Sequence, residues 1–406
     1  MINYQGKLVL GPMVRSGELP TRLLALKYGA DLVWSPEIID KKIITCKRVH
    51  NEKLNTIEYL DSHNKIIFNT YKPIEQSKLI FQMGSANPEI AVEAGLKVIQ
   101  DVDGIDLNCG CPKGFSVHAG MGAALLSTPN LLCDILKNLV SKVGEPNKKP
   151  ISCKIRLLSN LNDTLELIDK ICQTGIKNLT VHCRTRDMRN RQDPIHDYIP
   201  EIIKLTDKYN ISFIINGNIG SYFDYLKLKE KYGDKISGMI AESAESNPSI
   251  FSPNPLPWNK LILEFLTVCH KFNNHPANTK YILLNQLGTK SKYYPMFAKL
   301  KNNKDMLKLA YELQKDEEEK FYNYLKYRHL QKDEMIKMDD YKQLLKEYEV
   351  KSVESNEELD KLTDFDFNEF VSTTKPPITS TENKENEYKK RKNQEPDVPT
   401  TKKPTL

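Results

Sequence analysis

Short apolar segments alternate with helix-length segments from residue 7 to about residue 257, and this rhythm limits the possible folds more than any other feature. Several of the apolar segments are β-branched without polar alternation, as expected for parallel strands that are covered on both faces. The expected strands are 8–11, 31–34, 79–83, 104–108, 151–155, 178–182, 212–216 and 238–241. About eight strand–helix units in about 250 residues predict an α/β fold, a TIM (β/α)8 barrel, with a doubly wound open sheet as the competitor.

Helix signals separate the expected strands, and one segment breaks the rhythm. Helices are expected at 88–100, 130–143 and 162–174. Asn87 and Pro88 suit an N-cap and a first helical position, and Gly175 suits a helix end. Residues 41–78 interrupt the alternation and predict a small antiparallel sheet instead. Its strands are expected at 43–49, 56–59 and 65–69, with a turn at 61–64.

The pattern changes twice after the first domain, which we expect at 1–257. Residues 258–350 are rich in Lys, Glu, Leu and Tyr with few turn signals, and they predict an all-α helical bundle. Within it, residues 279–308 hold seven lysines and one acid, which suits phosphate contacts or, alternatively, a solvated helical face. Residues 351–406 are poor in apolar side chains and predict a disordered tail, in which 388–392 suits a nuclear address or a plain solvated segment.

Composition excludes several classes of protein. The chain is 28% charged with a net charge of +6, and no apolar run approaches the roughly 18 residues that span a membrane. The amino-terminal residues lack the charged and apolar regions of a signal peptide, and eight scattered cysteines suit reduced thiols. We therefore expect no membrane partner and a cytoplasmic or nuclear location, or both.

Polar side chains follow the carboxyl ends of the expected strands, whereas the strand bodies stay apolar. In α/β barrels this end holds the active site. The residues at these ends are Pro12, Met13, Val14, Gln82, Asn108, Cys109, Cys111, Lys154, His182, Arg184, Asn216, Gly217, Asn218, Ala241 and Glu242. This asymmetry predicts an active site without depending on any single residue.

Each of these signals also has a structural alternative. Lys154 would suit an ordinary strand-end lysine and His182 a satisfied structural histidine, while 216–218 would suit a plain turn. Cys109 and Cys111 suggest a metal, but no CxxC motif or histidine pair completes a zinc set, so we expect none. The chain also lacks the GxGxxG and GxxxxGK[ST] loops of dinucleotide and ATP sites. Nucleophile, metal ligand and proton donor remain open roles for a thiol.

Five motifs occur in a fixed order along the chain. They are LIFQMG at 79–84, DLNCGCPK at 106–113, GMGAALL at 120–126, VHCRTR at 181–186 and NGNI at 216–219. With this set the chain resembles the tRNA-dihydrouridine synthases over roughly residues 5–340, most closely the eukaryotic type that modifies position 20 of the D-loop. The resemblance implies a flavin-dependent TIM barrel with a C-terminal helical domain, in agreement with the pattern of elements.

The resemblance also implies the chemistry. The uracil C5=C6 bond of a uridine in tRNA is reduced by FMN, which NADPH reloads, and Cys111 protonates the carbon that does not receive the hydride. A thiol with an ordinary pKa near 8.5 is mostly protonated at neutral pH and can serve as this acid. Cys109 stands where the family has a non-thiol residue and receives no role. The expected FMN contacts are Pro12, Met13, Val14, Gln82, Lys154, His182, Asn216, Gly217, Asn218, Ala241 and Glu242.

Glu242 departs from the family pattern, which commonly has arginine there. An acid beside a phosphate repels it, so we expect only the backbone N–H to be used, with the side chain turned away. The tail cannot supply the double-stranded-RNA-binding domain of some animal relatives, so tRNA contacts fall to the helical domain and the barrel rim. The expected substrate contacts are Asn108, Lys113, Arg184, Arg186, Lys290 and Lys292, with the target base flipped out of the tRNA.

Two rival functions remain at this stage. One is a flavin barrel reductase that acts on a small free pyrimidine or enone. The other is a catalytically silent tRNA-binding protein, which would be purified without flavin. The oligomeric state is not encoded in the motifs, and a monomer is the expected state.

Overall fold

The computed structural model describes residues 2–256, 258–287, 291–316, 355–364 and 366, and its centre is a closed barrel of parallel strands. The barrel strands, in order around the ring, are β1 (Leu8–Leu10), β2 (Leu32–Trp34), β7 (Leu79–Gly84), β8 (Gly104–Cys109), β9 (Ile151–Leu157), β10 (Asn178–Thr185), β11 (Ser212–Asn216) and β12 (Ser237–Ile240). The first and last strands pair in parallel, with Leu8 opposite Gly238. This closure confirms the predicted barrel and excludes the open sheet.

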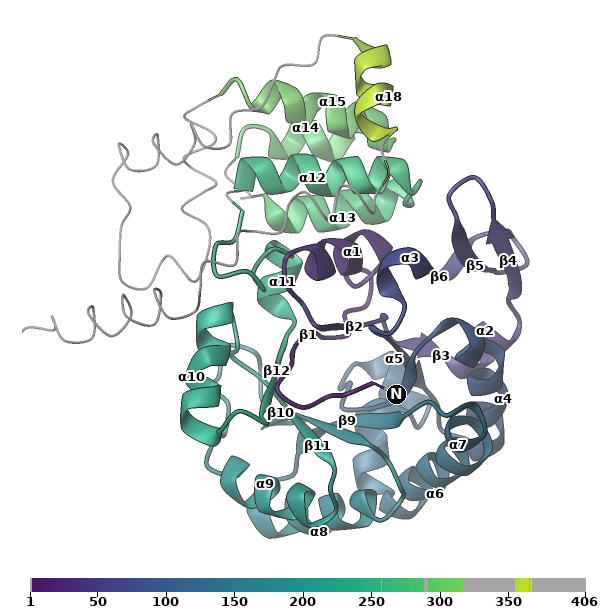
Figure 1. Cartoon of the computed structure of the whole chain (residues 1–406), viewed down its shortest axis with the longest axis vertical. Coiled ribbons are helices and arrows are strands. Elements are labelled where there is room, and N and C mark those ends of the chain that lie inside the picture. Colours follow the sequence, from purple (N-terminus) through teal and green to yellow (C-terminus); the bar gives the residue numbers. More distant parts are fainter. Residues whose placement is uncertain (1, 257, 288–290, 317–354, 365, 367–406) are drawn as a thin grey trace, which may run out of the picture.

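Helices surround the barrel (Figure 1). They are α1 (Leu19–Lys27), α2 (Asp40–Ile44), α3 (Lys72–Glu75), α4 (Pro88–Val98), α5 (Gly114–His118), α6 (Pro129–Leu139), α7 (Glu145–Asn147), α8 (Leu161–Cys172), α9 (Ile199–Lys208), α10 (Tyr222–Tyr232) and α11 (Glu242–Ser246), with η1 (Ile99–Asp101), η2 (Gly122–Ser127) and η3 (Val140–Gly144). Asn87 caps α4 as predicted, because its Oδ1 accepts the N–H of Ile90 at 2.9 Å. The short strand β3 (Ile38–Ile39) pairs with the end of β7.

The predicted interruption is an antiparallel sheet of β4 (Lys47–Asn51), β5 (Thr56–Leu60) and β6 (Ile66–Thr70). Its attachment to the barrel is partly apolar, since Phe68 packs edge-on against Phe81 of β7. It is also polar, since the buried Tyr59 donates to Asp101, which pairs with Arg48 at 2.6 Å. The first of these strands was expected from residue 43, and this was wrong. Residues 40–44 form α2 instead, because Ile43 turns into the barrel core from a helix.

Beyond the barrel, α12 (Trp258–Lys271), α13 (Pro276–Gln286), α14 (Tyr294–Lys299) and α15 (Asn303–Leu313) pack together beside α1 and α11 (Figure 1). These helices share one apolar core with α1, to which Leu23 and Phe265 both belong. A buried ion pair between Lys27 and Glu264, 2.7 Å apart, crosses the same interface. The division of the chain at residues 257 and 350 into separate domains stays a prediction.

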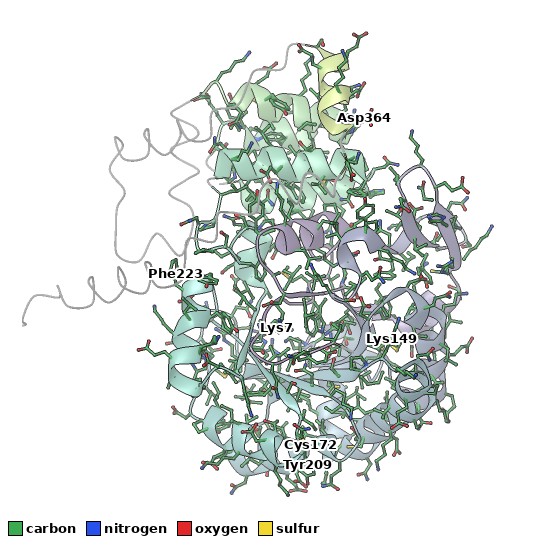
Figure 2. All side chains as sticks on the ribbon, in the orientation of Figure 1. Lys7, Lys149, Cys172, Tyr209, Phe223 and Asp364 are labelled. Carbon is green, nitrogen blue, oxygen red and sulfur yellow. The ribbon has the colours of Figure 1, made fainter. Side chains whose placement is uncertain are left out.

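One helix lies inside the segment predicted as a tail. α18 (Asn356–Thr363) packs against α12, and Figure 2 shows Asp364 at its end, beside the other helices. A capping box between Ser355 and Glu358 begins this helix, and Leu359 is buried. A wholly disordered segment 351–406 is therefore wrong for these residues, because an apolar contact and a capped start stabilise a helix. The remaining tail residues, including 388–392, lie outside the described residues.

Candidate active site at the carboxyl mouth of the barrel

A polar layer crosses the inside of the barrel below its carboxyl mouth. Gln82, Asp106 and Ser152 are register neighbours on β7, β8 and β9. Asp106 is fully buried and accepts hydrogen bonds from Gln82 Nε2 at 2.8 Å and Ser152 Oγ at 2.6 Å. Burial raises the pKa of this carboxyl to about 6. The layer fixes the Gln82 amide, whose Oε1 accepts from Asn108 Nδ2 at 3.1 Å.

Asn108 shapes the turn that carries the thiol out of β8. Its Oδ1 accepts the N–H groups of Gly110 and Cys111 at 2.9 and 3.0 Å, and Arg156 Nε donates to the carbonyl of Gly110 at 2.9 Å. Cys109 therefore ends in the core, whereas Cys111 is half-buried at the mouth. In the structure, Asn108 holds the backbone of the turn that carries Cys111. The expected contact of Asn108 with substrate stays a prediction.

Glu37 lies beside Cys111 and was missed in the sequence. Burial raises the pKa of the Cys111 thiol above its usual value, and the charge of Glu37 raises it further. Glu37 stands three residues after β2, the one barrel strand for which no end residue had been named. The signal was available as the single acid in the segment 35–39, but its distance from the strand end hid it.

The opposite wall of the mouth is cationic. Burial, followed by the charge of Arg156, lowers the pKa of Lys154 to about 8, and Lys154 has no hydrogen bond or ion pair with any described residue. Burial, followed by the charge of Lys154, lowers the pKa of His182 to about 2, so its imidazole is neutral. Arg184 Nη1 donates to His182 Nε2 at 3.1 Å. Lys154 is half-buried, and a cation withdrawn from water without a partner is stabilised when a ligand supplies an anion.

The structure corrects the expected position of Arg184. It was placed on the rim as a substrate contact, yet its exposure is only 3%. Its guanidinium donates to the carbonyls of Gln192 and Asn190 and to Asn218 Oδ1, at 2.7, 2.9 and 2.7 Å. The loop after β10 folds back over the side chain and makes Arg184 part of the wall.

The loop after β11 has an unusual backbone. Gly217 and Asn218 have positive φ values of 117° and 56°, and a Cβ at Gly217 would lie 3.3 Å from His182 Cδ2. The preceding Asn216 donates from Nδ2 to the carbonyl of Met239 at 2.9 Å, which ties β11 to β12. Successive N–H groups in such a turn form a concave anion site.

The rim holds the remaining predicted residues. Pro12, Met13 and Ala241 are half-buried, Val14 is 42% exposed, and Glu242, Lys113 and Arg186 are exposed. Glu242 begins α11. Burial lowers the pKa of Arg184 and the charge of Glu242 opposes this shift, so the acid sits within range of the cationic wall. The binding roles of these residues stay predictions.

The basic surface predicted for the helical part has fewer unengaged lysines than expected. Lys280 donates to the carbonyls of Ala298 and Leu300, Lys292 pairs with Asp316, and Lys304 pairs with Asp360. Lys290 lies outside the described residues. The exposed lysines that remain are Lys299, Lys301 and Lys308.

A cavity of about 520 Å³ opens at the amino mouth, on the opposite side of the barrel. Lys7 and Lys149, labelled in Figure 2, line it. Lys7 pairs with Asp31 at 3.2 Å, and Lys149 Nζ donates to the carbonyls of Ile99 and Val102 at 2.6 and 2.5 Å. These bonds serve the structure. In the described part of the chain no group of three or more His, Cys, Asp or Glu suits a metal, and no helix has the length and apolarity to cross a bilayer.

The closed barrel and the polar groups gathered at one mouth define an α/β-barrel enzyme, whose reaction takes place at the carboxyl ends of the strands. Comparison with known proteins narrows this class. The family profile described as dihydrouridine synthase (Dus) matches residues 9–349. The chain belongs to the dihydrouridine synthase family.

Three characterised relatives give the degree of similarity. The chain is 51% identical to the tRNA-dihydrouridine(20) synthase [NAD(P)+] of Saccharomyces cerevisiae, over 75% of this chain and 83% of the relative. It is 47% identical to the protein of the same name from Schizosaccharomyces pombe, over 77% of this chain and 66% of the relative. It is 31% identical to the tRNA-dihydrouridine(20a/20b) synthase [NAD(P)+] of Saccharomyces cerevisiae, over 72% and 76%.

Proposed function

We propose that the protein reduces the C5=C6 bond of a uridine in tRNA to 5,6-dihydrouridine, with FMN as the bound carrier and NADPH as the reductant. Family membership supports the reaction, and the names of the two most similar relatives above support tRNA as the substrate and position 20 as the site. The observation that carries the proposal is that a half-buried thiol, Cys111, and a half-buried cation without a partner among the described residues, Lys154, lie at one mouth.

The mouth fits a flavin mononucleotide in two respects. Lys154 needs an anionic partner, and the N1/O2 edge of a reduced flavin provides one. The N–H groups around Gly217 and Asn218 suit a phosphate, with the Arg184 guanidinium bonded to Asn218 at 2.7 Å. This guanidinium would offset the acid at Glu242, whose side chain is exposed. The chemistry supplied by bound FMN is hydride transfer to one carbon of the uracil C5=C6 bond.

Cys111 supplies the proton for the other carbon. Because burial raises its pKa, the side chain is a thiol rather than a thiolate at neutral pH. The backbone bonds from Asn108 hold the turn, and the Arg156 bond to Gly110 anchors it from β9. The chain therefore fixes where the S–H group points before substrate arrives.

Substrate binding uses the rim. We propose that Lys113 and Arg186 beside the mouth, and Lys299, Lys301 and Lys308 on the helical part, contact tRNA phosphates. The target base must leave the tRNA fold to reach the mouth. We further propose a monomer, in the cytoplasm or the nucleus or both.

The decisive experiment is reduction of an unmodified tRNA transcript by the purified protein with FMN and NADPH, followed by mapping of dihydrouridine. We expect product at position 20, none in a transcript with cytidine at that position, and a slower rate with NADH. Absence of product from the matched transcript, with flavin bound, would sink the proposed reaction.

A second candidate, reduction of a small free pyrimidine or enone, is favoured by the engagement of Lys280, Lys292 and Lys304 in internal bonds. A large RNA-binding surface on the helical part was the reason to disfavour it. Free uridine as the substrate in the same assay separates the two. Turnover of free uridine at the rate measured with tRNA would favour this alternative.

A further inference from the structure

Glu37 is packed against the backbone of β7 at the carboxyl mouth. The residues that follow it, Ile38 and Ile39, pair with Met83 and Gly84. A Cβ at Gly84 would lie 2.8 Å from Glu37 Oε1, so the carboxyl group occupies the space that a side chain at this position would fill. The pairing and the missing side chain together hold the carboxyl at the wall of the site.

The carboxyl of Glu37 is enclosed but has no established hydrogen bond. Both of its oxygens are buried and lack a well-aligned partner among the described residues. An ionised carboxylate in such a place is costly, whereas a neutral carboxylic acid is tolerated. In agreement, burial raises the pKa of Glu37 above its usual value.

One thiol and one hydroxyl group face this carboxyl group. They are Cys111 and Ser116, and both interact with Glu37. Gly122 closes the same space, since a Cβ there would lie 3.1 Å from Cys111 Cβ and would overlap Ser116 Oγ. Ser116 is fully buried and its hydroxyl has no other partner among the described residues. Three polar side chains, from the segments after β2 and β8 and from α5, therefore share one enclosed space, closed by glycines.

We propose that Glu37 reprotonates Cys111 after each turnover, an inference that rests on the proposed function. When Cys111 gives its proton to the uracil carbon, the S–H bond breaks and a thiolate remains. The Glu37 carboxylic acid then gives its proton to the sulfur, which forms S–H again and leaves a carboxylate. A solvent hydronium ion at the half-buried mouth then protonates the carboxylate, leaves as water and completes the cycle.

The direction of this transfer follows from acidity. A carboxylic acid is ordinarily a stronger acid than a thiol, so a protonated Glu37 beside a Cys111 thiolate gives its proton to the sulfur. The charged groups that face the pair are Lys113 on the loop, and Lys154 and Arg156 on β9. They stabilise the transient anion on either partner.

The first test measures the thiol without flavin or tRNA. Iodoacetamide alkylates thiolates, and the other seven cysteines are buried, so modification of Cys111 can be followed by peptide mass spectrometry against pH. At the pH where the thiol ionises, Glu37 is already an anion and opposes the second charge. We expect Glu37→Gln to move the midpoint of alkylation to lower pH by about one unit or more. The exposed Glu89→Gln is the matched control and should not move it.

The second test separates one turnover from many. With flavin reduced beforehand and Cys111 already protonated, Glu37→Gln should complete a single turnover at nearly the wild-type rate. Multiple turnover should fall on the order of tenfold or more, because each cycle waits for slow reprotonation of the sulfur. Equal losses in both assays would overturn the reprotonation, and an unchanged alkylation midpoint would overturn the coupling itself.

Gly84→Ala is the second variant, for the case that Glu37→Gln unfolds. The added methyl group displaces the Glu37 carboxyl from its site without removing it. The alkylation midpoint of Cys111 should therefore shift in the same direction by a smaller amount. No shift would count against the coupling. Failure of the proposed function would look different. The wild type would then make no dihydrouridine, while the alkylation midpoints would still report whether Glu37 and Cys111 interact.

Discussion

Both mouths of the barrel carry charged side chains, but the two mouths differ in whether these side chains have hydrogen-bond or ion-pair partners. At the amino mouth Lys7 pairs with Asp31, and Lys149 is bonded to two carbonyls. At the carboxyl mouth the half-buried Lys154 has no hydrogen bond or ion pair, and the buried carboxyl oxygens of Glu37 lack a hydrogen bond of good geometry, among the residues the structure describes. Polar groups with partners stabilise the fold, whereas unpaired ones cost stability and are kept for a ligand or a proton. The contrast locates the chemistry without reference to any relative.

Among substitutions at the carboxyl mouth, Cys111→Ala should have the largest effect on turnover. We expect turnover to fall on the order of 10²-fold to 10⁴-fold, because the proton donor is lost while the turn set by Asn108 remains. Flavin absorbance and tRNA gel shifts should be unchanged. Cys109→Ala is the control, since that thiol is buried in the core, and it should keep turnover. Wild-type rates in Cys111→Ala would remove the acid assignment.

Lys154→Met should separate stability from binding. Removal of a half-buried cation without a partner should raise the melting temperature of the flavin-free protein. The same change should weaken FMN binding about tenfold or more, which is at least about 1.4 kcal/mol, as measured by flavin fluorescence titration. Lys177→Met, at an exposed position, should change neither quantity. A destabilised protein with unchanged FMN affinity would contradict the contrast between the two mouths.

Asp106 makes stability depend on pH. Its folded pKa is raised to about 6, so its contribution to stability is complete below the unfolded pKa near 3.8 and is lost as the pH rises through about 6. Asp106→Asn removes the ionisation, and the Ser152 hydroxyl can turn to accept. Relative to wild type, the variant should gain up to about 3 kcal/mol of unfolding free energy between about pH 4 and about pH 7.5 in urea titrations. A constant difference across this range would argue against the shift.

Lys149→Met at the amino mouth should have the smallest effect. Two carbonyls lose their donor, so the free energy of unfolding should fall by about 1 to 3 kcal/mol. Turnover per folded molecule should be unchanged, because the residue lies at the opposite end from Cys111. The exposed neighbour Lys148→Met is the control for both measurements. A loss of turnover here would break the separation between the mouths.

The barrel could be predicted because its information is local. Each strand is a short apolar run, and the Asn87 cap and the antiparallel sheet have signals within a few residues of where they act. The strand-end rule then brought Cys111, Lys154 and His182 to one mouth, where the structure also places them.

The missed features depend on partners that are distant in the chain. The role of Glu37 depends on Gly84 and Cys111, which are distant in sequence and lie around it in the fold. Arg184 was expected at the surface because nothing local shows that the loop to Gln192 folds back over it. Lys304 was counted as free positive charge, but its partner is Asp360, 56 residues further along. Net charge in a window of sequence therefore overestimates a binding surface.

The core shared between α1 and the helical part has a consequence for synthesis of the chain. Lys27 and Glu264 are 237 residues apart in sequence, yet their contact buries both side chains. At roughly 5 to 20 residues per second, α1 leaves the ribosome on the order of 10 to 50 s before its partner helix exists. During that interval Leu19, Leu23 and Leu24 have no permanent cover. Until α12 emerges, the nascent barrel must therefore remain incompletely folded or be bound by a chaperone.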